Sequence, residues 1–147
     1  MGLHSVSWSV NVSALDQMKL IEDSLKWIAG EKSSIEITKD KSFHGANQYY
    51  IEAKNINKKD SKKSLERLGE EVLREILELG VKTRVDDNKF FHIRLKLSEL
   101  VRGKVSLANE RTVSSIVKGK FKIESYPGDS AIVVISNLIE ELINSEK

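Results

Sequence analysis

Apolar and polar residues alternate along five stretches of the chain, which is the pattern of a β-strand with one buried face. In the first stretch, Val6, Trp8, Val10 and Val12 alternate with serine and asparagine. The same pattern predicts strands over 34–39, 47–54, 89–97 and 117–125. The strands at 34–39 and 47–54 are expected to form a hairpin around the loop FHGAN, and a short extra strand is expected over 105–107.

Apolar residues at spacings of three and four predict three helices. The first is expected between Ser13, as its cap, and Gly30, and the second as one long helix over 57–79. The segment YPGD breaks the chain before the last helix, for which Asp129 or Ser130 is the predicted cap. A helical turn is expected in SELVRGK.

This order of elements predicts an α+β fold. Strands with one polar face and helices with one apolar face form a two-layer sandwich, in which the helices pack on one face of a mostly antiparallel sheet. A ferredoxin-like or split β-α-β arrangement fits the first five elements. No repeat or linker interrupts the pattern, so we predict a single domain over residues 1–147 whose second sheet face is open.

Composition limits the class of protein. With 147 residues, 39% hydrophobic and 31% charged, the chain can bury a core of its own. It contains no cysteine, which excludes disulfides and thiolate sites and favours the cytoplasm. No apolar stretch suggests a membrane span, and the three histidines show no metal-ligand spacing, so neither a metal nor another cofactor is expected.

The net charge is only +2, but the charges are unevenly distributed. Residues 54–63 contain five lysines against Asp60, whereas residues 124–147 contain five acidic residues against Lys147. A basic surface can attract phosphate even on a nearly neutral protein. The alternative is that these charges only coat a solvated surface.

Two predicted strands carry the residue types that bind RNA. Cationic side chains contact phosphates, and aromatic or guanidinium planes stack on unpaired bases. The polar faces of 89–97 and 117–125 carry these candidates: Phe90, His92, Arg94, Lys96, Lys118, Lys120 and Lys122. The alternative is that the lysines protect sheet edges against aggregation.

A second group of candidates lies near the start of the long predicted helix. It consists of Lys54, Lys58, Lys59, Lys62 and Lys63. Cations are unfavourable at a helix N-terminus, and a bound phosphate would neutralise them and accept hydrogen bonds from free amides. An exposed, solvated helix end is the alternative.

The segments FHGAN, NKFFHIRLKLSELVRGKVSLA and FKIESYPGD occur in this order. Together they resemble an archaeal family of RNA-binding proteins described as exosome-associated. The matching positions are His44 and Gly45, Phe91 and Arg94, Gly103 and Lys104, and Tyr126 to Gly128. The resemblance implies a ribosomal-protein-like fold, RNA as ligand, a nucleotide contact for His44, and exosome or ribosome-related proteins as partners. Arg102 and Lys104 of the Gly-Lys turn join the predicted RNA contacts.

No nucleophile–base pair and no phosphate-binding loop occurs in the sequence, so catalysis is not expected. The weaker enzyme alternative is a metal-dependent activity at Asp86 and Asp87, although adjacent acids in a loop are usually turn formers. We therefore predict a non-catalytic RNA-binding protein, an accessory factor in RNA processing or degradation. The alternative is an interaction module that dimerises through its open sheet face.

Overall fold

The computed structural model describes residues 2–13, 17–41, 47–112 and 115–145. Within them the strands are β1 (Gly2–Ser13), β2 (Ser34–Lys41), β3 (Asn47–Asn55), β4 (Phe90–Lys96) and β5 (Ile116–Glu124). The α-helices are α1 (Met18–Ala29), α2 (Lys58–Glu66), α3 (Glu70–Leu79), α4 (Leu97–Leu100) and α5 (Ala131–Ser145). One 3₁₀ turn, Lys82–Arg84, precedes β4.

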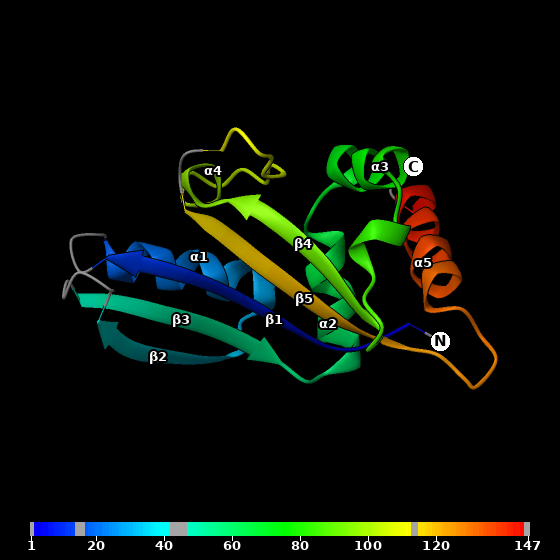
Figure 1. The fold of residues 1–147 in the computed structure, drawn as a ribbon, viewed down its shortest axis with the longest axis horizontal. Coiled ribbons are helices and arrows are strands. Elements are labelled where there is room, and N and C mark those ends of the chain that lie inside the picture. The colour runs from blue at the N-terminus through cyan, green and yellow to red at the C-terminus, as the bar shows by residue number, and fades with distance from the viewer. Residues whose placement is uncertain (1, 14–16, 42–46, 113–114, 146–147) are drawn as a thin grey trace.

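The strands form one antiparallel sheet in the order β2-β3-β1-β5-β4, which confirms the predicted α+β class. Because β3 lies between β1 and β2, the first three strands and α1 form the split β-α-β unit of ferredoxin-like folds. The strand beside β1 on its other side is β5, so β4 becomes an edge strand. In Figure 1, α1 and α2 lie behind the sheet, and α3 and α5 lie at one end.

The alternation in the sequence sorts the two sheet faces as predicted. The residues of β1 at even positions from Val6 to Val12 are buried, whereas the serines between them are only half-buried. The buried face joins one hydrophobic core that reaches from Leu3 to Ile143. All candidate RNA-binding residues of β4 and β5 have side chains on the other face.

Trp8 fixes the centre of the sheet against the helices. Its indole Nε1 donates a hydrogen bond of 2.8 Å to Ser64 Oγ, which in turn donates to the Ile28 carbonyl at 2.6 Å. The ring lies over Gly119 of β5, where an added Cβ would come within 2.4 Å of a Trp8 ring carbon. A glycine is therefore needed at position 119 for β1 and β5 to approach over this ring.

The prediction of one long helix over 57–79 is wrong. The chain turns at Gly69, whose φ of 88° is a left-handed conformation that glycine adopts easily, and the segment forms α2 and α3. This break lets α2 pack on β1 and α3 pack on α5. A single straight helix could pack against β1 or against α5, but not against both.

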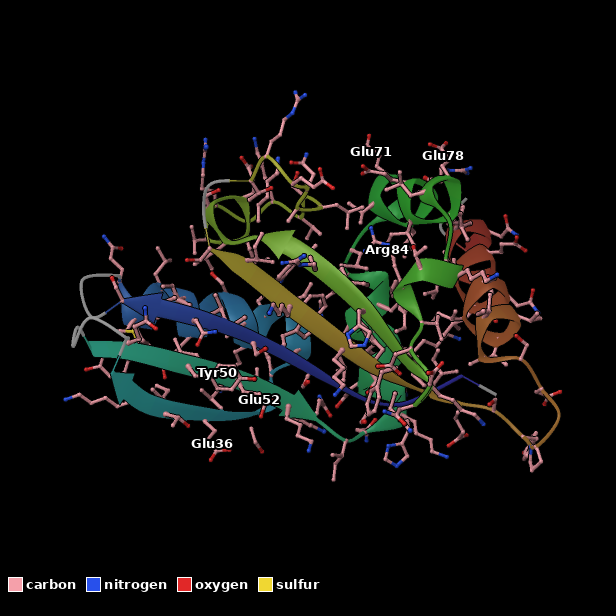
Figure 2. All side chains as sticks on the ribbon, viewed as in Figure 1. Glu36, Tyr50, Glu52, Glu71, Glu78 and Arg84 are labelled. Carbon is pink, nitrogen blue, oxygen red and sulfur yellow. The ribbon has the colours of Figure 1, made fainter. Side chains whose placement is uncertain are left out.

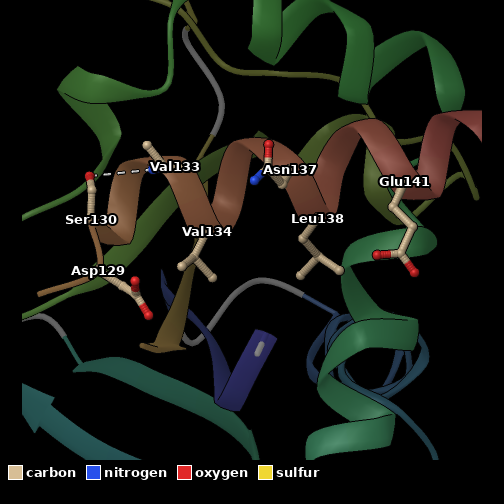
Figure 3. A pocket seen from close by; sticks show the side chains of 7 residues that line it. All are labelled: Asp129, Ser130, Val133, Val134, Asn137, Leu138 and Glu141. Atoms are coloured by element: carbon tan, nitrogen blue, oxygen red, sulfur yellow. Dashed lines mark hydrogen bonds between the residues drawn. The ribbon is translucent and has the colours of Figure 1, made fainter. Parts of the chain in front are cut away.

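Three smaller predictions are confirmed only in part. Ser13 ends β1 and is not the cap of α1, which begins after Gln17. The strand predicted over 105–107 is reduced to one bridge between Leu107 and Leu95. The first turn of α5 is capped by Ser130, whose Oγ accepts a hydrogen bond from the Val133 amide at 3.4 Å (Figure 3). Among the described helices, none has the length and apolar character needed to cross a membrane.

Candidate nucleic-acid interface

The open face of the sheet carries ordered rows of polar side chains. Cross-strand register places two rows across it: Glu52, Ser9, Lys118 and Arg94 in the Glu52 row, and Lys54, Ser7, Lys120 and His92 in the Lys54 row. Neighbouring strands are about 4.8 Å apart, and side chains two residues apart share a face. The register therefore brings candidates from three separate segments of the sequence together.

A shallow groove of about 410 Å³ runs across these rows. Small residues of the central strand β1, namely Ser5, Ser7 and Ser9, form its floor. The side chains along its two sides are Lys118, Lys120, Phe90 and His92 from β5 and β4, and Tyr50, Glu52 and Lys54 from β3. The short serine side chains leave a hollow between longer ones.

Lys118 and Lys120 are exposed cations of this groove. In the part of the chain that the structure describes, neither lysine has a carboxylate within ion-pairing distance. Arg94, which lies opposite Lys118, is also exposed and unpaired there. Their positive charges are available to an anion from solvent.

Phe90 holds two of the lysines by cation–π contacts. The ammonium nitrogens of Lys120 and Lys122 lie 4.1 and 4.6 Å from the centre of the Phe90 ring. Lys122 also donates a hydrogen bond of 2.7 Å to the Asn88 carbonyl. Phe90 was predicted to stack on a base, but in this conformation its ring orients cations, so a stacking base has to displace an ammonium group.

His92 is oriented by Asp86 at the edge of the groove. His92 Nε2 lies 2.7 Å from Asp86 Oδ2, and Asp86 Oδ1 accepts hydrogen bonds from the amides of Asn88 and Phe90. The hydrogen bond with His92, followed by the one from the Phe90 amide, holds the pKa of the Asp86 carboxyl below its usual value. Asp86 thus forms the turn before β4, the role usual for adjacent acids in a loop.

The helix lysines lie apart from the open face and two of them are paired with acids. Lys58 Nζ is 2.6 Å from Glu124 Oε2, and Lys62 Nζ is 3.3 Å from Glu141 Oε1. The hydrogen bond from Lys58 lowers the pKa of Glu124. The basic segment and the acidic C-terminal segment, separate in the sequence, therefore meet in the fold, where two of the lysines are neutralised.

The remaining candidates are distributed over other surfaces. Lys59 lies beside the Lys58–Glu124 pair, and Lys63 lines a hollow of about 830 Å³ with the half-exposed Trp27. Lys96 ends β4, and Arg102 and Lys104 are exposed in the turn after α4. These residues do not line the groove. His44 lies outside the described residues.

The charge of α5 differs from that of the open face. A hollow of about 370 Å³ along this helix is lined by Val133, Val134 and Leu138 together with Asp129 and Glu141 (Figure 3). Its carboxylates would repel phosphate. Among the described residues, no cluster of three or more histidine or acidic side chains could hold a metal ion.

Tyr50 and Glu52 are groove residues that the sequence prediction missed. Figure 2 shows both on the open face of β3, with Glu36 on the neighbouring β2. Tyr50 Oη donates a weak hydrogen bond of 3.4 Å to Glu52 Oε2. The alternation over 47–54 already assigned both residues to the polar face, but only the strand order shows that this face adjoins β1 and β5.

Solved structures from archaea share this fold. A DUF54 protein from Methanothermobacter thermautotrophicus aligns with a TM-score of 0.77 at 17% identity, over 97% of this chain and 99% of that chain. A DUF54-family protein from Archaeoglobus fulgidus aligns with a TM-score of 0.74 at 22% identity, over 95% and 99%. A UPF0201 protein from Methanococcus jannaschii aligns with a TM-score of 0.58 at 12% identity, over 95% and 92%. At these identities the likeness concerns the fold alone.

The sequence itself identifies the family. No curated protein matches the chain. The model of a family described as RNA binding matches residues 5–123, which include all or most of each described strand of the sheet. This confirms the resemblance to an archaeal RNA-binding family: the chain belongs to the RNA-binding family.

Proposed function

We propose that this protein binds RNA through the open face of its sheet and does so without catalysing a reaction. The observation that carries the proposal is the pair Lys118 and Lys120, which lie at a serine-floored groove and have no acidic partner among the described residues. Phosphates of an RNA backbone are the anions that a row of regularly spaced lysines fits.

The surrounding residues support the same assignment. In the Lys54 row, Lys54 lies on one side of Lys120 and His92 on the other. In the Glu52 row, Arg94 lies next to Lys118. Guanidinium and imidazole groups can bind phosphate or stack on a base. The open face therefore combines an electrostatic path for the backbone with planar groups at its edge.

The arrangement of Asp86 supports a non-catalytic role. Both of its carboxylate oxygens accept hydrogen bonds, from His92 and from two backbone amides, within one turn. These three bonds occupy most of the roughly four acceptor positions that a carboxylate could offer to a magnesium ion. Incubating labelled RNA with the protein and magnesium should leave the RNA intact, and cleavage lost in Asp86→Asn would contradict this part of the proposal.

Removing the two unpaired lysines tests the RNA interface. In Lys118→Ala/Lys120→Ala we expect RNA affinity, measured by fluorescence anisotropy, to fall about tenfold, or about 1.4 kcal/mol. The slope of log affinity against log salt should decrease by up to about 1.4, because each contact to a single strand contributes about 0.7. Lys122 is kept, since it also supports the turn at Asn88.

Lys58→Ala/Lys62→Ala is the matched control. It removes the same charge from lysines that are already paired with Glu124 and Glu141. We expect a small change in affinity and slope. Equal losses in the two double variants would show that total charge, and not the open face, determines binding, and no loss in either would refute the interface.

We further propose that RNA binding serves RNA processing or degradation, in association with exosome or ribosome-related proteins. The family resemblance alone supports this finer assignment. Co-purification of the tagged protein after ribonuclease treatment tests it, because partners bound directly stay attached when RNA is removed.

The alternative function is dimerisation through the open face. Light scattering of the free protein tests it.

A further inference from the structure

The open face is electrically polar along the Glu52 row, from a carboxylate on β3 to two cations on β5 and β4. Glu52 and Lys118 are both opposite Ser9, so two strand spacings, about 9.6 Å, separate their backbones. They line the same groove without forming an ion pair. The serine between them leaves the space over the row open.

This polarity orients a bound nucleotide. Its phosphate is attracted to Lys118 and Lys120 and repelled by Glu52, so the RNA backbone follows β5. The base then extends over the serine floor toward β3. One nucleotide is long enough to reach from the lysine side of the groove to the glutamate side.

Two groups at the β3 side can contact that base. Tyr50, 36% exposed, offers an aromatic ring for stacking, and its hydroxyl lies 3.4 Å from Glu52 Oε2. The ionised Glu52 carboxylate can only accept hydrogen bonds, through two oxygens side by side. Its directly opposite neighbour on β2 is Glu36, so no cross-strand cation competes for these oxygens there.

The chemistry of the bases distinguishes which of them fits. Guanine carries two adjacent donors on its Watson–Crick edge, the N1–H and the 2-amino group, which match the two oxygens of a carboxylate. Adenine and cytosine offer one amino group beside an acceptor, and uracil offers one imino donor between two acceptors. An acceptor facing an acceptor is unfavourable, so a carboxylate discriminates against these three.

We propose that the groove binds an unpaired guanosine of single-stranded RNA, with its phosphate at Lys118 and Lys120, its base on Tyr50 and its Watson–Crick edge at Glu52. The inference rests on the proposed function of the open face and adds specificity to it. A base-paired guanine has its Watson–Crick edge occupied, so double-stranded RNA does not satisfy this site.

The experiment uses fluorescein-labelled uridine oligonucleotides in which one central position is guanosine, inosine, adenosine, cytidine or uridine. For the wild type we expect the guanosine probe to bind about tenfold more tightly than the adenosine probe, the size of one bidentate contact. Inosine lacks the 2-amino group and should lie between them. Equal binding of all five probes would overturn the inference.

Glu52→Gln and Glu36→Gln separate the specific acid from its neighbour. Both variants remove one negative charge from the same face, and the two residues are directly opposite each other, but only Glu52 lines the groove. We expect Glu52→Gln to abolish the preference for guanosine and Glu36→Gln to keep it. The inference is wrong if both variants lose the preference or if both keep it.

Tyr50→Phe and Tyr50→Ala test the stacking surface. The phenylalanine variant should keep most of the affinity for the guanosine probe, whereas the alanine variant should lose about tenfold. Equal affinity of the two would show that the ring does not contact the base.

The same titrations distinguish failure of this inference from failure of the proposed function. If the wild type binds every probe equally and Lys118→Ala/Lys120→Ala still weakens binding, only guanosine recognition is wrong. If the wild type binds no probe at low salt, both proposals fall.

Discussion

Two lysine groups of this protein show how context decides what a cation can do. Lys118 and Lys120 project from β5 onto the open face and have no acidic partner among the described residues. Lys58 and Lys62 project from α2 on the other side of the sheet and contact Glu124 and Glu141. The helix group is denser in the sequence, yet the strand group presents more uncompensated charge to solvent. Local charge density is therefore a weaker guide to a binding surface than the fold that places its counter-charges.

The strand group also depends on the core beneath it. Gly119 lies between the two lysines and faces the opposite way, onto the ring of Trp8, where a Cβ would come within 2.4 Å. Trp8 is fully buried and hydrogen-bonded to Ser64, so it cannot move aside easily. The placement of the β5 lysines beside β1 thus depends on a packing constraint on the other face of the sheet.

Breaking this constraint should give the largest effect. We expect Gly119→Ala to lower the free energy of unfolding by about 3 kcal/mol, because overpacking a rigid core forces the ring or the strand to shift. The melting temperature should fall by about 6–12 °C. Gly2→Ala is the control, since the Cβ added to this strand glycine would have no heavy atom within 4 Å apart from those of its chain neighbours. Equal shifts of the two variants in a thermal melt would contradict the packing argument.

Removing their acidic partners should make the helix lysines available to RNA. In Glu124→Gln/Glu141→Gln, Lys58 and Lys62 lose their partners and should bind phosphate as the β5 lysines are expected to do. We expect RNA affinity to rise about threefold and the salt slope to increase by up to about 1.4, measured by anisotropy across a salt series.

A matched variant separates pairing from total charge. Glu71 and Glu78 lie on the outer side of α3, away from both lysine groups (Figure 2), and neither forms an ion pair among the described residues. Glu71→Gln/Glu78→Gln changes the net charge by the same amount. If it raises affinity as much as the first pair, then loss of the Lys58 and Lys62 partners is not the cause.

The sequence predicted the layers of the fold better than their connections. Alternation such as that of β1 correctly predicted the strands and their buried faces, because burial of one face acts locally. The break at Gly69 was missed, since the apolar spacing of Leu65, Leu68 and Val72 continues through it. The helix has to end at Gly69 because its two halves pack on different partners, α2 on β1 and α3 on α5.

The sequence also predicted only those parts of the candidate site that depend on local pattern. The lysines of β5 and the planar groups of β4 follow from alternation, and the register confirms that they are neighbours. The ion pairs of Lys58 and Lys62 could not be predicted, because their partners lie 66 and 79 positions along the chain. Tyr50 and Glu52 were missed because pairing of β3 with β1 is a long-range property of the sheet.

The acid beside His92 has a different role from the acids beside the helix lysines, because it supports a turn and does not neutralise a lysine. Asp86 binds His92 and also forms the turn before β4. Since its pKa is lowered from the ordinary 3.8, the unfolded chain takes up a proton at higher pH than the folded protein. The stability that Asp86 contributes is therefore present above pH 3.8 and is lost as the pH falls through the lower, folded-state pKa.

Asp86→Asn should give the smallest effect. The amide oxygen can still accept the two backbone hydrogen bonds of the turn, so only the charge that favours His92 is lost. We expect the urea midpoint of the variant to lie slightly below that of the wild type at neutral pH, as for exposed pairs in general, and the difference to disappear well below pH 3.8. Asp87→Asn, an exposed neighbour without these hydrogen bonds in the described structure, should match the wild type at both pH values. A difference that persists in acid would mean that the carboxylate acts through the shape of the turn and not through its charge.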